Sequence, residues 1–325
     1  MLGVVLAAVF VGLWRIQGSE YIFLPDIAHP VAPLVRVAGG HDPKNGGAIY
    51  FVDVLVRKAT LLEELFGGLE SGADLYPAAE VVPPGVTSAQ AEDVDLAEMK
   101  TSQEVAAAVA LRALGRKVTT AQGGAIVSAV EPGFPAAGHL DPTDVIVAVD
   151  GKPVVSPAGV ATAMAGKPIG STVSFTVVRN GKHRTLSLHT VAASRGSKRG
   201  VVGVYLAPNE TIKLPIRVSI DAHGIGGPSA GLAFALEVMQ QLGRNVDHGQ
   251  KIAATGQIFL NGTIGPIGGI RQKTIGAREA HVSAFLVPAG QNATDAEKYA
   301  HGLRIIPVTS FTQALHELAT LAPAH

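Results

Sequence analysis

The sequence contains no cysteine, and its charges cancel, with 26 basic and 26 acidic residues. A chain without cysteine forms no disulfide, no thiolate metal site and no cysteine nucleophile. The missing basic excess argues against a nucleic-acid partner. Hydrophobic residues, in contrast, make up 47% of the 325 positions. That content supports folded cores, and the length is enough for about two to three domains.

A phosphate-binding loop is missing as well. The Walker sequence G-x-x-x-x-G-K-[S/T], whose backbone and lysine hold nucleotide phosphates, occurs nowhere in the 325 residues. We therefore expect no ATP, and we expect no metal and no other cofactor.

At the N-terminus, an unbroken run of apolar residues and glycine extends from Leu2 to Trp14 and is followed by Arg15. As a helix this run is about 20 Å long, short of the roughly 30 Å hydrocarbon core of a bilayer. It lacks the basic leader and the small-residue cleavage site of a signal peptide. We predict that residues 1–15 are a membrane anchor whose start is trimmed or wrongly assigned, with Trp14 near the interface. The alternative is a buried core helix.

Residues 16–122 form a predicted N-terminal α+β region. The stretch from Gly46 to Val56 is rich in β-branched and aromatic residues, which favours a strand. A helix is predicted near 101–115, because Thr101 precedes Glu104 by three positions, as in a capping box.

Residues 123–192 change to short strands around one or two small helices, with a hairpin turn at Asn180–Gly181. The segments "EPGFPAAG", "DVIVAVDGKPV" and "VVRNGK" together resemble a bacterial PDZ domain. The usual "PGD" before the second core strand reads "PTD" here, at 142–144.

The resemblance implies that this domain adds a peptide to its sheet as an extra strand. We place that groove at 158–165 and at four residues of the first strand: Gly123, Gly124, Ala125 and Ile126. A spacer domain that binds no peptide is the alternative.

The stretch "DAHGIGGPSAGLAFALEVM" places Ser229 at the start of a predicted helix. Free backbone N–H groups and the positive end of the helix dipole gather there, and an oxyanion needs such donors. Glycines beside the serine, including Gly227, let a substrate backbone approach. The local pattern leaves two interpretations open, because Ser229 is either a nucleophile or a helix cap.

A nucleophilic serine needs a proton acceptor within hydrogen-bond reach. His223, oriented by Asp221, is one candidate. Both lie in the same glycine-rich loop as the serine, whereas the members of a catalytic triad normally come from separate segments.

"GGPSAG" followed by "ATGQIFLNGTIGPIGGIRQK" resembles the proteolytic domain of Lon-type serine proteases, from about residue 200 to 325. The resemblance implies that Ser229 is the nucleophile, that Lys273 is the general base and acid, and that Thr255 orients the lysine. Arg271 also follows the "PIGG" sequence, but an arginine does not give up its proton.

A lysine base must be neutral, and its unperturbed pKa is about 10.4. Lowering that pKa to about 7 requires roughly 4–5 kcal/mol of differential interaction, which burial supplies. No acid lies between Gln257 and Arg278. Gly226 and Gln257 also stand where related Lon enzymes often carry carboxylates, and this pattern is consistent with a neutral amine.

The whole chain resembles the membrane-anchored, PDZ-containing Lon-like proteases of bacteria. The resemblance implies a multidomain α+β protein with a single membrane pass and its catalytic part outside the cytoplasm. It implies an ATP-independent serine endopeptidase that acts on unfolded or flexible polypeptides, and a possible homo-oligomer. A PDZ adaptor on an inactive Lon-like fold is the rival hypothesis.

Overall fold

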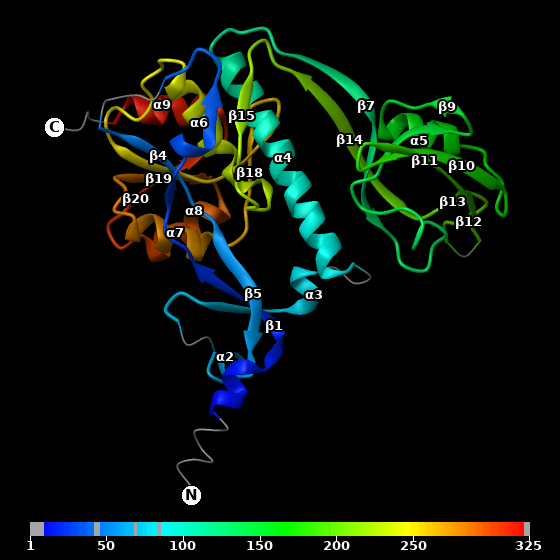
Figure 1. Cartoon of the computed structure of the whole chain (residues 1–325), viewed down its shortest axis with the longest axis horizontal. Coiled ribbons are helices and arrows are strands. Elements are labelled where there is room, and N and C mark those ends of the chain that lie inside the picture. Colours follow the sequence, from blue (N-terminus) through cyan, green and yellow to red (C-terminus); the bar gives the residue numbers. More distant parts are fainter. Residues whose placement is uncertain (1–9, 42–45, 68–69, 83–85, 195, 322–325) are drawn as a thin grey trace, which may run out of the picture. The chain divides into compact units, whose positions relative to one another are not determined.

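A computed structural model describes residues 10–41, 46–67, 70–82, 86–194 and 196–321. The chain divides into two compact units (Figure 1). Unit 1 comprises residues 1–83, 98–118 and 214–325, and unit 2 comprises residues 84–97 and 119–213. Unit 2 is thus an insertion within the chain of unit 1.

Unit 1 is built on a five-stranded sheet of order β2-β4-β16-β19-β20, in which only β2 is antiparallel to its neighbour. Its strands are β2 (His29–Pro30), β4 (Ala48–Phe51), β16 (Lys251–Ala254), β19 (Ala284–Pro288) and β20 (Arg304–Val308). Its helices and 3₁₀ turns are η1 (Ala32–Leu34), η2 (Pro228–Ala230), α6 (Gly231–Gln241), α7 (Ile270–Glu279), α8 (Gln291–Ala300) and α9 (Phe311–Ala319). The central strands are buried, as apolar runs in parallel sheets usually are.

Two antiparallel pairs complete this part of unit 1, β3 (Val35–Val37) with β15 (Val218–Ile220) and β17 (Gln257–Ile258) with β18 (Ile264–Gly265). The N-terminal segment supplies β3 and β4 to these sheets. Residues 16–122 therefore do not form the separate N-terminal region that was predicted. The predicted strand at 46–56 is also two strands, β4 and β5 (Val54–Thr60), separated by Val52 and Asp53.

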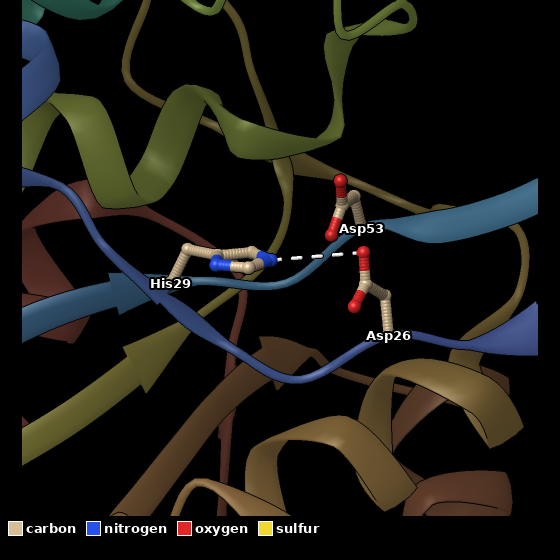
Figure 2. Close-up of side chains that lie close together, drawn as sticks. All are labelled: Asp26, His29 and Asp53. Carbon is tan, nitrogen blue, oxygen red and sulfur yellow. Dashed lines mark ion pairs between the residues drawn. The ribbon is translucent and has the colours of Figure 1, made fainter.

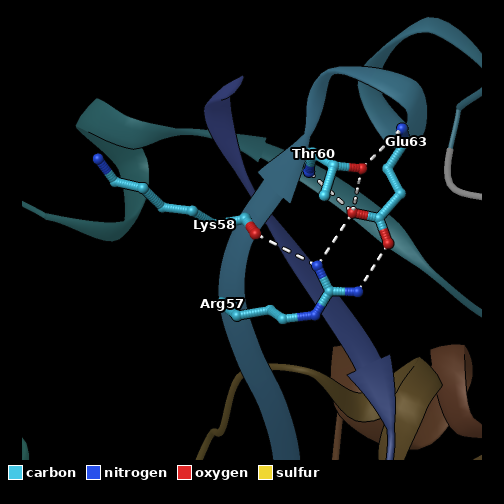
Figure 3. Close-up of polar contacts among 4 residues, drawn as sticks. All are labelled: Arg57, Lys58, Thr60 and Glu63. Atoms are coloured by element: carbon cyan, nitrogen blue, oxygen red, sulfur yellow. Dashed lines mark hydrogen bonds and ion pairs between the residues drawn. The ribbon is translucent and has the colours of Figure 1, made fainter. Parts of the chain in front are cut away.

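A second sheet of unit 1 has the order β5-β1-β6 and uses β1 (Gln17–Pro25) and β6 (Asp74–Pro77), followed by α3 (Ala78–Val81). Helix α2 (Leu61–Leu65) follows β5 directly. Its N-cap Thr60 forms a capping box with Glu63, and the Glu63 carboxylate accepts two hydrogen bonds from Arg57 (Figure 3). The guanidinium also donates to the Lys58 carbonyl, so the arginine ties the strand to the helix.

The Arg57 guanidinium lowers the pKa of Glu63 from 4.5 to about 2. A carboxyl whose pKa is depressed on folding stabilises the fold above its unfolded pKa, and this contribution is lost as the pH falls toward its folded pKa. We expect Glu63→Gln to lower the free energy of unfolding by about 1–2 kcal/mol at pH 7, because the arginine is partly exposed. The loss should shrink between pH 4.5 and 2 in urea titrations. Glu297→Gln, at an exposed acid, is the control.

Helix α4 (Ser88–Ala113) begins well before the predicted start at Thr101. Thr87 and Gln90 exchange the hydrogen bonds of a capping box at its N-terminus. The Thr101–Glu104 pair has capping-box spacing but lies in the helix interior, so the prediction of this boundary was wrong.

Unit 2 contains a sheet of order β11-β10-β8-β7-β14, with β9 paired to β8. Its elements are β7 (Thr119–Val130), β8 (Val145–Val149), β9 (Lys152–Pro153), α5 (Pro157–Met164), β10 (Thr172–Arg179), β11 (Lys182–His189), β12 (Val191–Ala192), β13 (Gly200–Val201) and β14 (Val204–Lys213). The hairpin turn at Asn180–Gly181 has positive φ at both residues, as predicted for a tight turn of this kind. Because β14 belongs to this sheet, the unit extends to Lys213, beyond the predicted boundary at residue 192.

Most of the predicted membrane anchor, residues 1–9, lies outside the described residues. Residues 10–15, where the described part of the chain begins, are helical, and Phe10 and Trp14 are more than half exposed. Among the described helices, none has the length and apolar character needed to span a bilayer.

Candidate active site

Ser229 lies in η2, where the chain turns from a glycine loop into α6. Gly227 has φ 79°, a left-handed conformation that suits glycine, and Pro228 occupies the first turn. The 3₁₀ turn has no side-chain cap, so the serine hydroxyl does not serve as one. Ser229 is partly buried.

Lys273 lies in α7, and the structure brings its amine to the serine. The Lys273 Nζ is 2.6 Å from the Ser229 Oγ, across 44 positions of sequence, and donates a hydrogen bond to it. Only 5% of the lysine surface is exposed. Burial lowers the pKa of Lys273 from 10.5 to about 8, while the charge of Asp53 acts in the opposite direction. At pH 7 about one amine in ten is then neutral.

The neighbouring Arg271 turns to other partners. Its guanidinium pairs with Asp74 and lies over the ring of Tyr299, 5.1 Å from the ring centroid. Geometry therefore separates the two basic residues that follow the "PIGG" sequence, because only Lys273 contacts the serine.

Thr255 is fully buried and contacts the nucleophile's backbone. Its Oγ1 donates to the Ser229 carbonyl at 3.2 Å, and the Gly256 N–H donates to the same carbonyl at 2.8 Å. The predicted role was to orient Lys273. In the structure Thr255 instead holds the serine's own peptide group.

A second support comes from α4. The buried Ser102 donates from its Oγ to the Pro228 carbonyl at 2.9 Å. A Cβ on Gly231 would lie 2.6 Å from the Ser102 Oγ, so the glycine allows α4 to approach the start of α6 closely. Sequence reasoning missed Ser102, because a serine within a helix carries no local signal of a contact so far along the chain.

His223 and Asp221 form an exposed pair rather than a catalytic one. Their side chains are 69% and 72% exposed, and the Nδ1–Oδ2 distance is 3.5 Å. The hydroxyl of Ser229 is engaged by Lys273 instead. The alternative in which His223 acts as the base therefore loses its geometric support.

Three further titratable groups lie close to one another (Figure 2). One ligand-type atom from each of Asp26, His29 and Asp53 lies within 4.8 Å of the others. Asp26 and His29 each have side chains 43% exposed and pair at 3.6 Å. Three such atoms do not by themselves define a metal site. The sequence analysis overlooked this cluster, because its residues are far from the serine and lysine motifs.

The predicted peptide groove on unit 2 needs correction. Both edges of β7 are occupied at Ala125 and Ile126, which pair with Pro208 and Ala207 of β14 and with Ile146 and Val145 of β8. The segment Gly123, Gly124, Ala125 and Ile126 therefore lies inside the sheet. In the part of unit 2 that the structure describes, β14 pairs with β7 alone and is one edge strand of the sheet, while β11 is the other.

Comparison with known proteins identifies two domains. Residues 112–190 match the PDZ domain family, and residues 195–320 match the Lon protease (S16) C-terminal proteolytic domain. Lon protease 1 of Sorangium cellulosum is 46% identical over 79 residues, 24% of this chain and 10% of that protein. The Lon protease of Azorhizobium caulinodans is 31% identical over 146 residues, 43% of this chain and 17% of that protein.

Among solved structures, the PDZ domain of an SdrC-like protein from Listeria monocytogenes is 24% identical, covering 26% of this chain and 88% of that one, with a TM-score of 0.25. The corresponding domain from Listeria innocua is 25% identical, covers 26% and 92%, and has a TM-score of 0.24. The matched part of this chain spans only 10% and 17% of the length of these two Lon proteases.

The matches support a multidomain α+β chain that combines a PDZ domain with the proteolytic domain of a Lon-type serine peptidase. The more particular assignment is a Lon-like protease with a PDZ domain.

Proposed function

We propose that the chain is an ATP-independent serine endopeptidase in which Lys273 and Ser229 form a catalytic dyad. The observation that carries this proposal is the 2.6 Å contact between a buried amine and a half-buried hydroxyl. An amine whose pKa lies near 8 exchanges protons with a hydroxyl near neutral pH.

In the first step, neutral Lys273 takes the Ser229 proton while the serine oxygen bonds to the peptide carbonyl carbon. The carbonyl π electrons move to oxygen, and the backbone N–H groups of Gly227 and Ser229 are proposed to stabilise that oxyanion, since Pro228 has no N–H. The lysine then passes its proton to the departing amine as the C–N bond breaks. Water enters with the same base and releases the acyl group, which restores the hydroxyl.

The PDZ domain is proposed to present polypeptide tails, with β14 as the strand that accepts them. An edge strand has unpaired backbone groups, which a peptide of extended conformation satisfies. Cleavage without ATP is part of the proposal, and unfolded or flexible polypeptides are the substrates that need no unfolding motor.

Membrane anchoring, with the catalytic part outside the cytoplasm, is a further part of the proposal. Support comes from the apolar run of Leu2 to Trp14 and from Phe10, Val11 and Trp14, which are 53%, 52% and 58% exposed. Release of the full chain from cell membranes by alkaline carbonate would argue against an anchor. Protection of its proteolytic domain from external protease would argue against a catalytic part outside the cytoplasm.

The test is incubation of the purified chain with an unfolded protein, with and without ATP. We expect internal cleavage that is independent of ATP and falls by at least about a thousandfold in Ser229→Ala. Binding of polypeptide without cleavage would favour the adaptor hypothesis. A dependence on ATP would contradict the motor-free mechanism.

A further inference from the structure

The chain between β4 and β5 crosses α7 beside the catalytic lysine. A Cβ on Gly276 would lie 3.2 Å from Cγ1 of Val52, and a Cβ on Gly269 would lie 2.6 Å from Cγ2 of Val54. Lys273 lies between these two glycines along the helix. Asp53, between the two valines, is therefore level with the lysine.

The segment before β2 lies against the same helix. A Cβ on Gly276 would overlap the Asp26 carbonyl oxygen, and the Ala28 N–H donates to the Gly276 carbonyl at 3.2 Å. Because positions three apart share a helix face, Gly276 and Lys273 face the same side. Both segments that carry the carboxylates of Figure 2 thus contact α7 within one turn of Lys273.

Asp53 has an unusual oxygen. Its Oδ1 is buried and finds no hydrogen-bond partner among the described residues. Burial raises the pKa of Asp53, the charge of Asp26 adds to this effect, and its own backbone N–H, His29 and Lys273 lower it. A buried carboxylate oxygen without a partner is costly unless a positive charge forms nearby.

We propose that Asp53 is a positioning residue for Lys273. The Asp53 carboxylate stabilises the Lys273 ammonium that forms when Ser229 gives up its proton. This inference rests on the proposed dyad. In the resting enzyme, burial disfavours the ammonium. During acylation a positive charge appears on the lysine, and a carboxylate already in place lowers the free energy of that state. Asp53 exchanges no proton with the substrate and acts through the lysine alone.

The groups that face this pair are few. The charge that acts on Lys273 comes from Asp53. The groups that act on Asp53 are Asp26, His29 and Lys273. Two other charges of α7 have partners of their own, since Arg271 pairs with Asp74 and Arg278 donates to the Tyr299 carbonyl, and Glu279 at the end of the helix is exposed.

The test uses the full chain and compares Asp53→Asn with Asp53→Glu and Asp74→Asn. Asp53 raises the pKa of Lys273, so removing its charge should move the acid limb of the kcat/KM profile to lower pH. The alkaline plateau should fall by about ten- to a hundredfold, because the ammonium loses its counter-charge. Asp53→Glu keeps a carboxylate, so its acid limb and its plateau should both lie closer to those of the wild type than in Asp53→Asn. Asp74→Asn removes the β6 carboxylate that pairs with Arg271 of α7 and should leave the acid limb of the profile in place.

A titration of Lys273 by NMR in protein labelled with ¹³C-lysine reports the same change without substrate. A lower titration midpoint in Asp53→Asn supports the inference. Unchanged midpoints and pH profiles in a folded, active Asp53→Asn protein would overturn it and leave the dyad intact. If the wild-type chain cleaves nothing, the proposed function fails instead, and the NMR titration still decides whether Asp53 acts on the lysine.

Discussion

Replacing Lys273 by methionine is expected to reduce kcat/KM for peptide cleavage by at least about a thousandfold and to increase stability. The loss of activity follows because methionine has no basic nitrogen to accept the Ser229 proton. The gain in stability follows from burial, which lowers the pKa of Lys273 to about 8. At pH 7 the lysine is mostly charged in both the folded and unfolded chain, so folding must desolvate an ammonium. Removing it should increase the free energy of unfolding by about 1–3 kcal/mol.

The sign of this stability change distinguishes a catalytic residue from a structural one. The gain should be present at pH 7 and should shrink as the pH rises from about 8 toward 10.5, where the lysine becomes neutral in both states. Urea denaturation at pH 7 and pH 10 measures it. A destabilised Lys273→Met protein would mean that the amine supports the fold, and the loss of activity would then lose its simple interpretation.

The wild-type enzyme provides a second check on the same residue. Its kcat/KM should rise about tenfold per pH unit below the lysine pKa of about 8 and level off above it. Lys273→Arg is the matched variant, because it keeps a positive charge but stays protonated. It should be as inactive as Lys273→Met across the whole range. Activity in the arginine variant would exclude proton transfer by this side chain.

The sequence indicated the pair of Ser229 and Lys273 because each residue lies in a segment that resembles the Lon-type proteolytic domain. Ser229 follows a glycine and a proline at a helix start, and Lys273 follows a glycine loop at the next such start. The tight turn at Asn180–Gly181 was equally predictable, because two residues with positive φ are needed there.

The surroundings of the dyad could not be predicted in the same way. The stretch from Gln257 to Arg278 contains no acid, which indicated a lysine without a carboxylate neighbour. The fold brings Asp53 to it from the N-terminal segment. That segment enters the central sheet through β4, which pairs in parallel with β16. Pairing between strands so distant in sequence leaves no local periodicity from which to infer it.

The pairing of β14 with β7 in unit 2 was equally hard to predict, and it explains why the peptide groove was misplaced. A strand with alternating residues does not show which strand will pair with it. The run after Gly200 was assigned to the proteolytic domain, whose family match also begins at residue 195, and in the structure this run contributes β14 to the sheet of unit 2 along β7. That pairing closes the edge at Ala125 and Ile126, where the peptide groove was predicted. The free edge moves to β14, which leads directly into the chain of the proteolytic domain.

The second large effect is expected at Gly276 in α7. In a helix, replacing glycine by alanine normally stabilises by about 1 kcal/mol. At Gly276 the added Cβ would overlap the carbonyl oxygen of Asp26, which belongs to backbone and cannot rotate away. We therefore expect Gly276→Ala to lower the free energy of unfolding by at least about 2 kcal/mol, opposite in sign to the helix propensity.

The same substitution should reduce activity, because the segment it displaces holds Asp26 against the helix that carries Lys273. Gly268→Ala is the matched control, since a Cβ there meets nothing within 4 Å and its φ lies outside the left-handed region. Thermal unfolding measures the stability of both variants, and a peptide cleavage assay measures their activity. A Gly276→Ala protein as stable and active as Gly268→Ala would show that α7 does not pack directly on the Asp26 backbone. The placement of Asp53 level with Lys273 would then have to be revised.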